Sequence, residues 1–110
     1  MAVALSLQAS VRNVVRTCAR VQPGELVCIA ADTNTLSIAL ALVEAVREAG
    51  AEPVMVTMTP RRAHGNEPPR VVAAAMKAAD VVIQPVTYAI THTDATQDAL
   101  RAGARVLVLR

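Results

Sequence analysis

The chain has 110 residues, enough for one domain with a single hydrophobic core but short for an enzyme with a complete cleft. Apolar residues make up 54% of it, yet it has no Trp or Phe and only one Tyr, so its core must be aliphatic. The formal net charge is +2, and the arginines are scattered apart from Arg61-Arg62. Because the chain has neither a basic patch nor aromatic residues on which bases could stack, its composition argues against nucleic-acid binding.

No segment approaches the roughly 20 consecutive apolar residues of a membrane span. The apolar start, Met1 to Leu7, carries no basic residue and is too short for a signal peptide. We therefore expect a cytoplasmic protein with no membrane partner. Cys18 falls on the apolar face of a predicted helix and Cys28 inside a predicted strand, so both are expected to be small buried residues rather than disulfide partners.

The first predicted element is an amphipathic helix that Ser6 could cap. Its arginines fall on one face, and its apolar residues recur at helical spacing on the other: Leu7, Val11, Val14, Val15 and Cys18.

The stretch from Leu26 to Ala31 predicts the central strand of the domain. It has no charge, follows the turn signal Pro23-Gly24, and reads as a strand buried on both faces. Four small polar residues, Asp32, Thr33, Asn34 and Thr35, follow it directly. Their side chains can accept hydrogen bonds from the free amides of a following helix, at the edge where open α/β sheets bind their ligands.

Helices and strands alternate in the rest of the chain. The first of these predicted elements are a helix from Leu36 to Val46 that Gly50 closes, a strand over 53–59 and a breaker-rich loop over 60–69. A helix that starts at Pro68-Pro69, has its buried residues between Val72 and Ala79 and is ended by Asp80 follows. The last elements are a strand over 81–83, a loop over 85–91, a helix begun by Thr93-Asp94 and stopped by Gly103, and a strand over 105–109.

This order predicts a single α/β domain over residues 1–110. One helix, three β-α pairs and a final strand indicate a three-layer, doubly wound sheet of about four mainly parallel strands, flavodoxin-like or Rossmann-like. The last strand is followed at once by Arg110, with no helix to cover it. We therefore expect a fragment of a longer chain, or a last strand that a partner subunit covers.

The sequence contains no glycine-rich phosphate-binding motif. The predicted helix starts at Asn34 and Thr93 could still bind a phosphate or carboxylate through free amides. One hypothesis is therefore a stand-alone, flavodoxin-like binding module for a small anion. Another is a dimerisation domain whose edge strand pairs with a second copy.

His64 and His92 lie in two loops at the same predicted sheet edge, and Asp32 could join them as a third metal ligand. No short-range spacing links these residues, so the pattern is a weak metal signal. The simpler expectation is a solvated His64 in a mobile loop and a His92 bonded within its own loop.

Three further side chains are candidates for recognition. Arg61 and Arg62 could clamp a carboxylate or phosphate, although loop arginines are usually only solvated. Tyr88 could offer its hydroxyl to a ligand, or its ring could fill a gap.

Several stretches, in the same order, resemble the amino-terminal region of the thermophilic metalloaminopeptidase family, of the aminopeptidase T type. A related member of that superfamily is 2,5-dihydroxypyridine 5,6-dioxygenase, a non-haem iron enzyme. The stretches that carry the resemblance are 21–25, 31–33, 47–52, His64-Gly65-Asn66-Glu67-Pro68-Pro69, 73–80, Thr91-His92-Thr93 and Gly103-Ala104-Arg105.

The resemblance implies a parent enzyme that is a metal-dependent hydrolase or a ring-cleaving dioxygenase. Its Glu, His and Asp ligands, and its zinc, cobalt or iron, would lie in a larger carboxyl-terminal domain, so no catalytic residue, metal ligand or cofactor is assigned to this chain. The chain would be a non-metal domain, inactive alone, that packs on the catalytic domain, takes part in a homodimer and exposes an apolar surface beside its last strand. The cleft-lining candidates are Asp32, Thr33, Arg61, His64, Thr91, His92 and Thr93.

Overall fold

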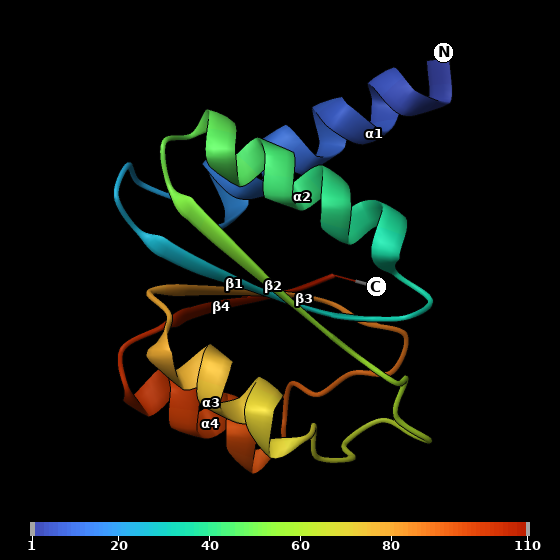
Figure 1. Cartoon of the computed structure of the whole chain (residues 1–110), viewed down its shortest axis with the longest axis vertical. Helices are drawn as coiled ribbons and strands as arrows, with labels where there is room; N and C mark the ends of the chain where they lie inside the picture. The colour runs from blue at the N-terminus through green and yellow to red at the C-terminus, as the bar shows by residue number, and fades with distance from the viewer. Residues whose placement is uncertain (1, 110) are drawn as a thin grey trace.

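The computed structural model describes residues 2–109, with side chains from Leu7 onward. The elements alternate as expected (Figure 1): α1 (Ala2–Asn13), a π-helical turn η1 (Val14–Cys18), β1 (Leu26–Asp32), α2 (Leu36–Glu48), β2 (Glu52–Met58), α3 (Arg70–Ala78), β3 (Val81–Pro85), α4 (Asp94–Arg101) and β4 (Arg105–Leu109).

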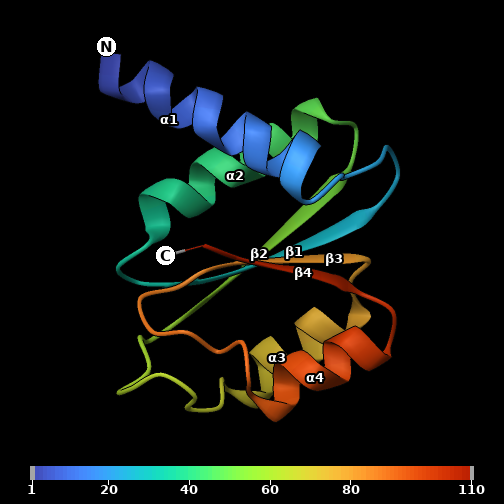
Figure 2. The ribbon, with the colours of Figure 1, turned by 180° about the vertical axis from the view of Figure 1, so that it is seen from behind.

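All four strands form one parallel sheet in the order β2-β1-β3-β4. Helices α1 and α2 cover one face and α3 and α4 cover the other (Figures 1 and 2). The three-layer, doubly wound prediction is therefore confirmed, and the strand order is the flavodoxin-like one. Strands β1 and β3 are neighbours whose following helices lie on opposite faces, so the sheet's topological switch point falls between them.

Strand β1 supplies the core on both faces of the sheet. Val27, Ile29 and Ala31 pack with α1 and α2, whereas Cys28 and Ala30 pack with α3 and α4. Because a parallel strand between two helical layers has no solvent face, every residue of β1 after Leu26 is buried. This explains why the stretch carries no charge until Asp32.

The first helix differs from its prediction at both ends. It begins at Ala2, so Ser6 lies inside α1 rather than at its cap. At its other end the Ala19 amide donates to the Val14 carbonyl at 2.8 Å, a bond spanning five residues. The extra residue in this π-helical turn rotates the following side chains, so Ala19 is buried and Cys18 is exposed. The expectation that Cys18 is buried is therefore wrong, while Cys28 is buried as expected.

Two ion pairs join segments that are distant in the sequence. Arg12 of α1 donates to Glu48 of α2 at 2.9 Å across the surface of the helical layer. Arg105, at the start of β4, forms a bidentate pair with Glu25, at 2.7 and 2.9 Å. Glu25 also accepts from the Gln22 amide at 2.8 Å, so it fixes the turn that leads into β1.

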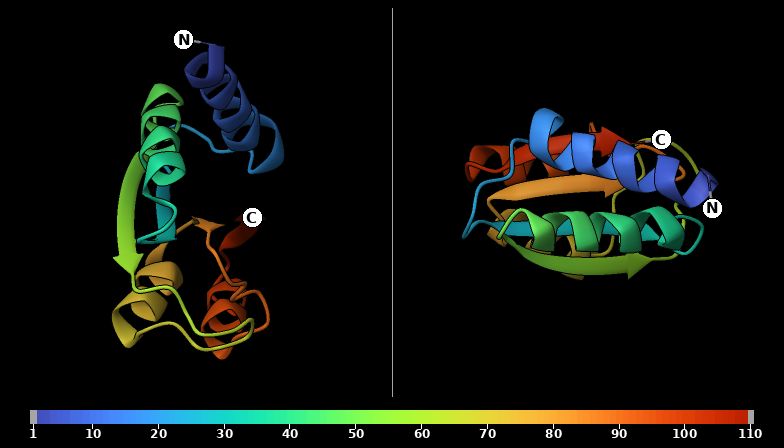
Figure 3. Two further views of the ribbon diagram at one scale, coloured as in Figure 1. Left: turned by 90° about the vertical axis from the view of Figure 1, so that its right-hand side faces the viewer. Right: turned by 90° about the horizontal axis from the view of Figure 1, so that it is seen from above.

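Seen from above, α1 and α2 lie side by side over the sheet, and β4 forms one of its edges (Figure 3). The strand's Leu107 and Leu109 are only partly buried against the core that α1 and α2 cover. None of the helices within residues 2–109 combines the length and apolar character that crossing a membrane requires.

The Glu25–Arg105 pair predicts a pH-dependent stability. The hydrogen bond from Arg105 lowers the pKa of Glu25 below its usual value of 4.5. The stabilisation is therefore complete above pH 4.5 and is lost as the pH falls through the lower pKa of the folded state. We expect Glu25→Gln to reduce the free energy of unfolding at pH 7 by on the order of 1 kcal/mol, since solvent screens the pair. Urea titrations at pH 7 and pH 3 measure the difference.

Glu44→Gln is the matched control, because Glu44 pairs with Arg47 on the exposed face of α2 at 3.4 Å. This variant should differ little from wild type at either pH. A Glu25→Gln deficit of equal size at pH 7 and pH 3 would contradict the assigned role.

The two cysteines should differ in reactivity. Burial raises the pKa of the Cys28 thiol to about 11, whereas Cys18 is exposed. Because the thiolate is the reactive form, iodoacetamide at pH 8 should modify Cys18 alone in the native protein and both residues in urea. Peptide mass spectrometry locates the label, and native Cys18→Ser protein should remain unlabelled. Rapid labelling of Cys28 in the native protein would show that the reagent reaches strand β1, contrary to its burial.

Candidate functional site

Three loops meet at the carboxyl edge of the sheet, where open α/β folds bind their ligands. They are residues 33–35 after β1, 59–69 after β2 and 86–93 after β3. Six of the seven cleft-lining candidates lie in these loops, and the seventh, Asp32, is the last residue of β1. The structure assigns them different roles, because some side chains are bound within the chain and others are exposed.

Asp32 fills the switch point between β1 and β3. Its side chain is 1% exposed, and its two carboxylate oxygens accept three hydrogen bonds. One oxygen accepts from the Thr87 amide at 2.7 Å, and the other accepts from the Thr87 hydroxyl at 3.0 Å and the Asn34 amide at 2.9 Å. Asp32 therefore ties together the loops that follow β1 and β3, and its oxygens are already used within the chain.

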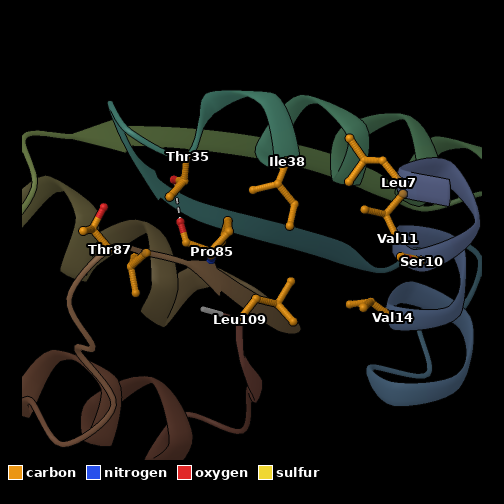
Figure 4. A pocket seen from close by; sticks show the side chains of 10 residues that line it. Leu7, Ser10, Val11, Val14, Thr35, Ile38, Pro85, Thr87 and Leu109 are labelled. Carbon is orange, nitrogen blue, oxygen red and sulfur yellow. Dashed lines mark hydrogen bonds between the residues drawn. The ribbon is translucent and has the colours of Figure 1, made fainter. Parts of the chain in front are cut away.

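Thr35 reinforces the same junction. Its hydroxyl accepts from the Asp32 amide at 3.1 Å and donates to the Pro85 carbonyl at 2.6 Å, the bond drawn in Figure 4. The loop after β1 is thus held by side chains, and helix α2 begins directly after it at Leu36.

An apolar groove opens beside this junction (Figure 4). Its volume is about 440 Å³, and it lies between α1 on one side and the ends of β3 and β4 on the other. Most of its lining is aliphatic. The residues of this apolar groove are Leu7, Ser10, Val11, Val14, Thr35, Ile38, Pro85, Val86, Thr87 and Leu109. The apolar surface expected beside the last strand is therefore present.

The loop over 60–69 is bound to the loop after β3. The Gly65 amide donates to the Ala89 carbonyl at 2.9 Å, and the Ala89 amide donates to Nδ1 of His64 at 2.9 Å. The His64 ring also meets the Tyr88 ring edge to face, with centroids 5.2 Å apart. The prediction of a His64 that is merely solvated is therefore wrong, because the imidazole joins two loops.

Glu67 caps helix α4, a role that the sequence analysis missed. Its two carboxylate oxygens accept from the amides of Asp94 at 2.7 Å and Ala95 at 3.1 Å. A carboxylate at a helix N-terminus satisfies free amides and complements the helix dipole. Thr93 caps the helix as predicted, accepting from the Thr96 amide at 3.3 Å.

These contacts argue against the two predicted anion sites. At the Thr93 start, Glu67 already holds the position that an external phosphate or carboxylate would take. At the Asn34 start, the amide of Asn34 donates to Asp32. A carboxylate of the chain therefore binds the first amides of α4, and another binds the Asn34 amide, which precedes the first residue of α2.

The other candidates lie at the surface of the same edge. Thr33 is exposed, and its amide donates to the Met58 carbonyl at the end of β2 at 3.1 Å. Thr91 is half-buried and His92 is exposed. Among the described residues, no three His, Cys, Asp or Glu side chains are grouped closely enough to hold a metal ion, so Asp32, His64 and His92 do not form the weak site considered above.

Arg61 and Arg62 line a second hollow, of about 420 Å³, at the carboxyl end of β2. The hollow, called here the arginine hollow, is lined by Thr59, Pro60, Arg61, Arg62 and Asn66. Arg61 is half-buried and donates to the carbonyls of Thr59 and Glu67, whereas Arg62 is exposed.

Replacing the Asp32 carboxylate should loosen the junction of β1 and β3. In Asp32→Asn, whichever way the amide is turned, the backbone N–H of Thr87 or of Asn34 faces an NH₂ group and loses its acceptor. We expect the free energy of unfolding to fall by about 2 kcal/mol, since an unpaired donor costs more than a lost bond. Urea denaturation measures the loss.

Thr87→Val is the control, because it removes the two hydrogen bonds of the Thr87 hydroxyl, to Asp32 at 3.0 Å and from the Asn34 side chain at 3.4 Å, and leaves both backbone N–H groups paired. It should cost about 1 kcal/mol. If Asp32→Asn costs no more than Thr87→Val, the carboxylate is not the link between the two loops.

The chain has a measurable likeness to known proteins. The family model for 2,5-dihydroxypyridine 5,6-dioxygenase (NicX) matches residues 6–110, whereas no curated protein matches the chain significantly. The solved 2,5-dihydroxypyridine dioxygenase from Pseudomonas putida KT2440 superposes with a TM-score of 0.78 at 19% sequence identity. At that identity the superposition shows the fold alone.

The superposition covers 94% of this chain and 33% of the dioxygenase chain, so this chain spans about a third of its structural neighbour. Neither likeness supports the aminopeptidase part of the resemblance, but the dioxygenase part agrees with the family match. Because that match extends over nearly all of the sequence, the chain belongs to the 2,5-dihydroxypyridine 5,6-dioxygenase family.

Proposed function

We propose that this chain is a non-metal α/β domain of a larger dioxygenase-family enzyme, that it packs against the catalytic domain and shapes its cleft, and that it is inactive alone. The observation that carries the proposal is the apolar groove. It brings the half-buried Leu7 and Val14 opposite the half-buried Leu109, and a second body that covered these aliphatic side chains would remove them from water.

The polar groups of the sheet edge support the same role. Asp32 is the last residue of β1, Glu67 lies in the loop after β2, and the carboxylates of both are bound to backbone amides. A carboxylate committed in this way holds loops in place rather than binding a metal ion. In the proposal, the divalent metal and its Glu, His and Asp ligands belong to the catalytic domain, and the complete enzyme is a cytoplasmic homodimer.

The relatives favour a ring-cleaving parent over a peptidase. The family model that matches the chain is named for a dioxygenase, the solved neighbour is a dioxygenase, and neither comparison supports the aminopeptidase resemblance. The substrate proposed for the parent is therefore a hydroxylated heteroaromatic ring of the kind that the family name describes.

The reading frame beyond Arg110 gives the first test. We expect it to continue for a domain or more and to encode clustered Glu, His and Asp residues. The 110-residue chain alone should then bind no stoichiometric Fe²⁺ in anaerobic calorimetry, and should not raise oxygen uptake with 2,5-dihydroxypyridine above that of free Fe²⁺. A stop codon after Arg110, or iron-dependent turnover by the chain alone, would contradict the proposal.

The groove can be tested in the same longer protein. Val14→Arg places a charge in the apolar groove and should lower both the melting temperature and the ring-cleavage rate. Val71→Arg is the control, since Val71 is 74% exposed on α3, outside the groove. Equal effects of the two variants would show that the groove is not the docking surface.

A further inference from the structure

We propose that the arginine hollow binds the oxyanion of a small acid, a carboxylate or a phosphate, through Arg61 and Arg62. This inference rests on the loop over 60–69 and not on the function proposed above. The hollow lies at the carboxyl end of β2, at the sheet edge where ligands of open α/β folds bind.

The first argument is charge. Among the described residues, neither Arg61 nor Arg62 forms an ion pair, although four other arginines do. The acidic residue of this loop is Glu67, and both of its oxygens accept from α4 amides. Two guanidinium groups therefore line one hollow without a carboxylate to neutralise them.

The second argument is preorganisation. The Arg61 guanidinium donates to the Thr59 carbonyl at 2.9 Å and to the Glu67 carbonyl at 3.3 Å, which fixes its position across the base of the loop. The loop itself is bound to Ala89 through Gly65. A cation held before the ligand arrives loses little side-chain entropy on binding, so its attraction for an anion is retained.

The third argument is the hydrogen-bonding character of the lining. The side-chain oxygen of Asn66 accepts from the Ala63 amide at 3.1 Å, which leaves the NH₂ group of that side chain as a donor. The hollow therefore offers hydrogen-bond donors from Arg61, Arg62 and Asn66, together with the Thr59 hydroxyl. Its lining includes no carboxylate. Guanidinium groups match the oxygens of carboxylates and phosphates, and about 420 Å³ is enough for a small acid.

Titration of the ¹⁵N-labelled chain with succinate and, separately, with inorganic phosphate tests the proposal. We expect saturable chemical-shift changes at the amides of Thr59 and residues 61–66 with at least one of the two. Sodium chloride of equal ionic strength should not reproduce them. Binding by succinate alone identifies a carboxylate ligand, binding by phosphate alone identifies a phosphate ligand, and binding by both supports a general oxyanion site.

Arg62→Gln is the decisive variant, because the exposed Arg62 side chain has no partner in the described part of the chain and its loss should leave the fold intact. It should weaken binding about tenfold. Arg16→Gln removes the same charge from η1, outside the hollow, and should bind as wild type does. The proposal would be overturned by chemical-shift changes that do not saturate or that sodium chloride reproduces. It would also be overturned if Arg62→Gln and Arg16→Gln weakened binding equally.

Discussion

The sheet edge depends on one buried carboxylate. At the switch point, the chain leaves β1 toward one face and β3 toward the other, so backbone amides are left between two diverging loops. Asp32 fills that space and accepts from Thr87 and Asn34. The position at which a doubly wound fold commonly holds a ligand is therefore closed by a side chain of the protein itself. What remains open lies to either side of it, as the apolar groove and the arginine hollow.

The fold could be predicted because its signals are local and periodic. The uncharged run from Leu26 to Ala31 marks a strand covered on both faces, and the alternation of strands with amphipathic helices determines a parallel sheet. No local or periodic pattern in the sequence indicates the π-helical turn. Its extra residue depends on how α1 packs over the sheet, and it exchanges the positions of Cys18 and Ala19 relative to the core.

The candidate site could be predicted only where its contacts are local. Thr93 caps a helix that begins one residue later, so a short sequence pattern was sufficient. Glu67 caps the same helix from 27 residues away, and His64 meets Ala89 across 25 residues. These two contacts exist only because the loops that follow β2 and β3 lie side by side, which depends on the order of strands in the sheet. An acidic residue in a proline-rich loop gives no sign of that role.

Acidic and basic side chains have different roles at this edge of the sheet. The carboxylates of the buried Asp32 and the exposed Glu67 both bind backbone amides, whereas Arg61 and Arg62 line a hollow without an acidic partner. An acid that serves as a cap is no longer available as a metal ligand or a base, but it fixes the loop that carries the arginines. The contacts of Asp32 and Glu67 thus fix loops at the same sheet edge that carries the arginine hollow. Because its two arginines have no acidic partner among the described residues, the hollow at this edge attracts anions.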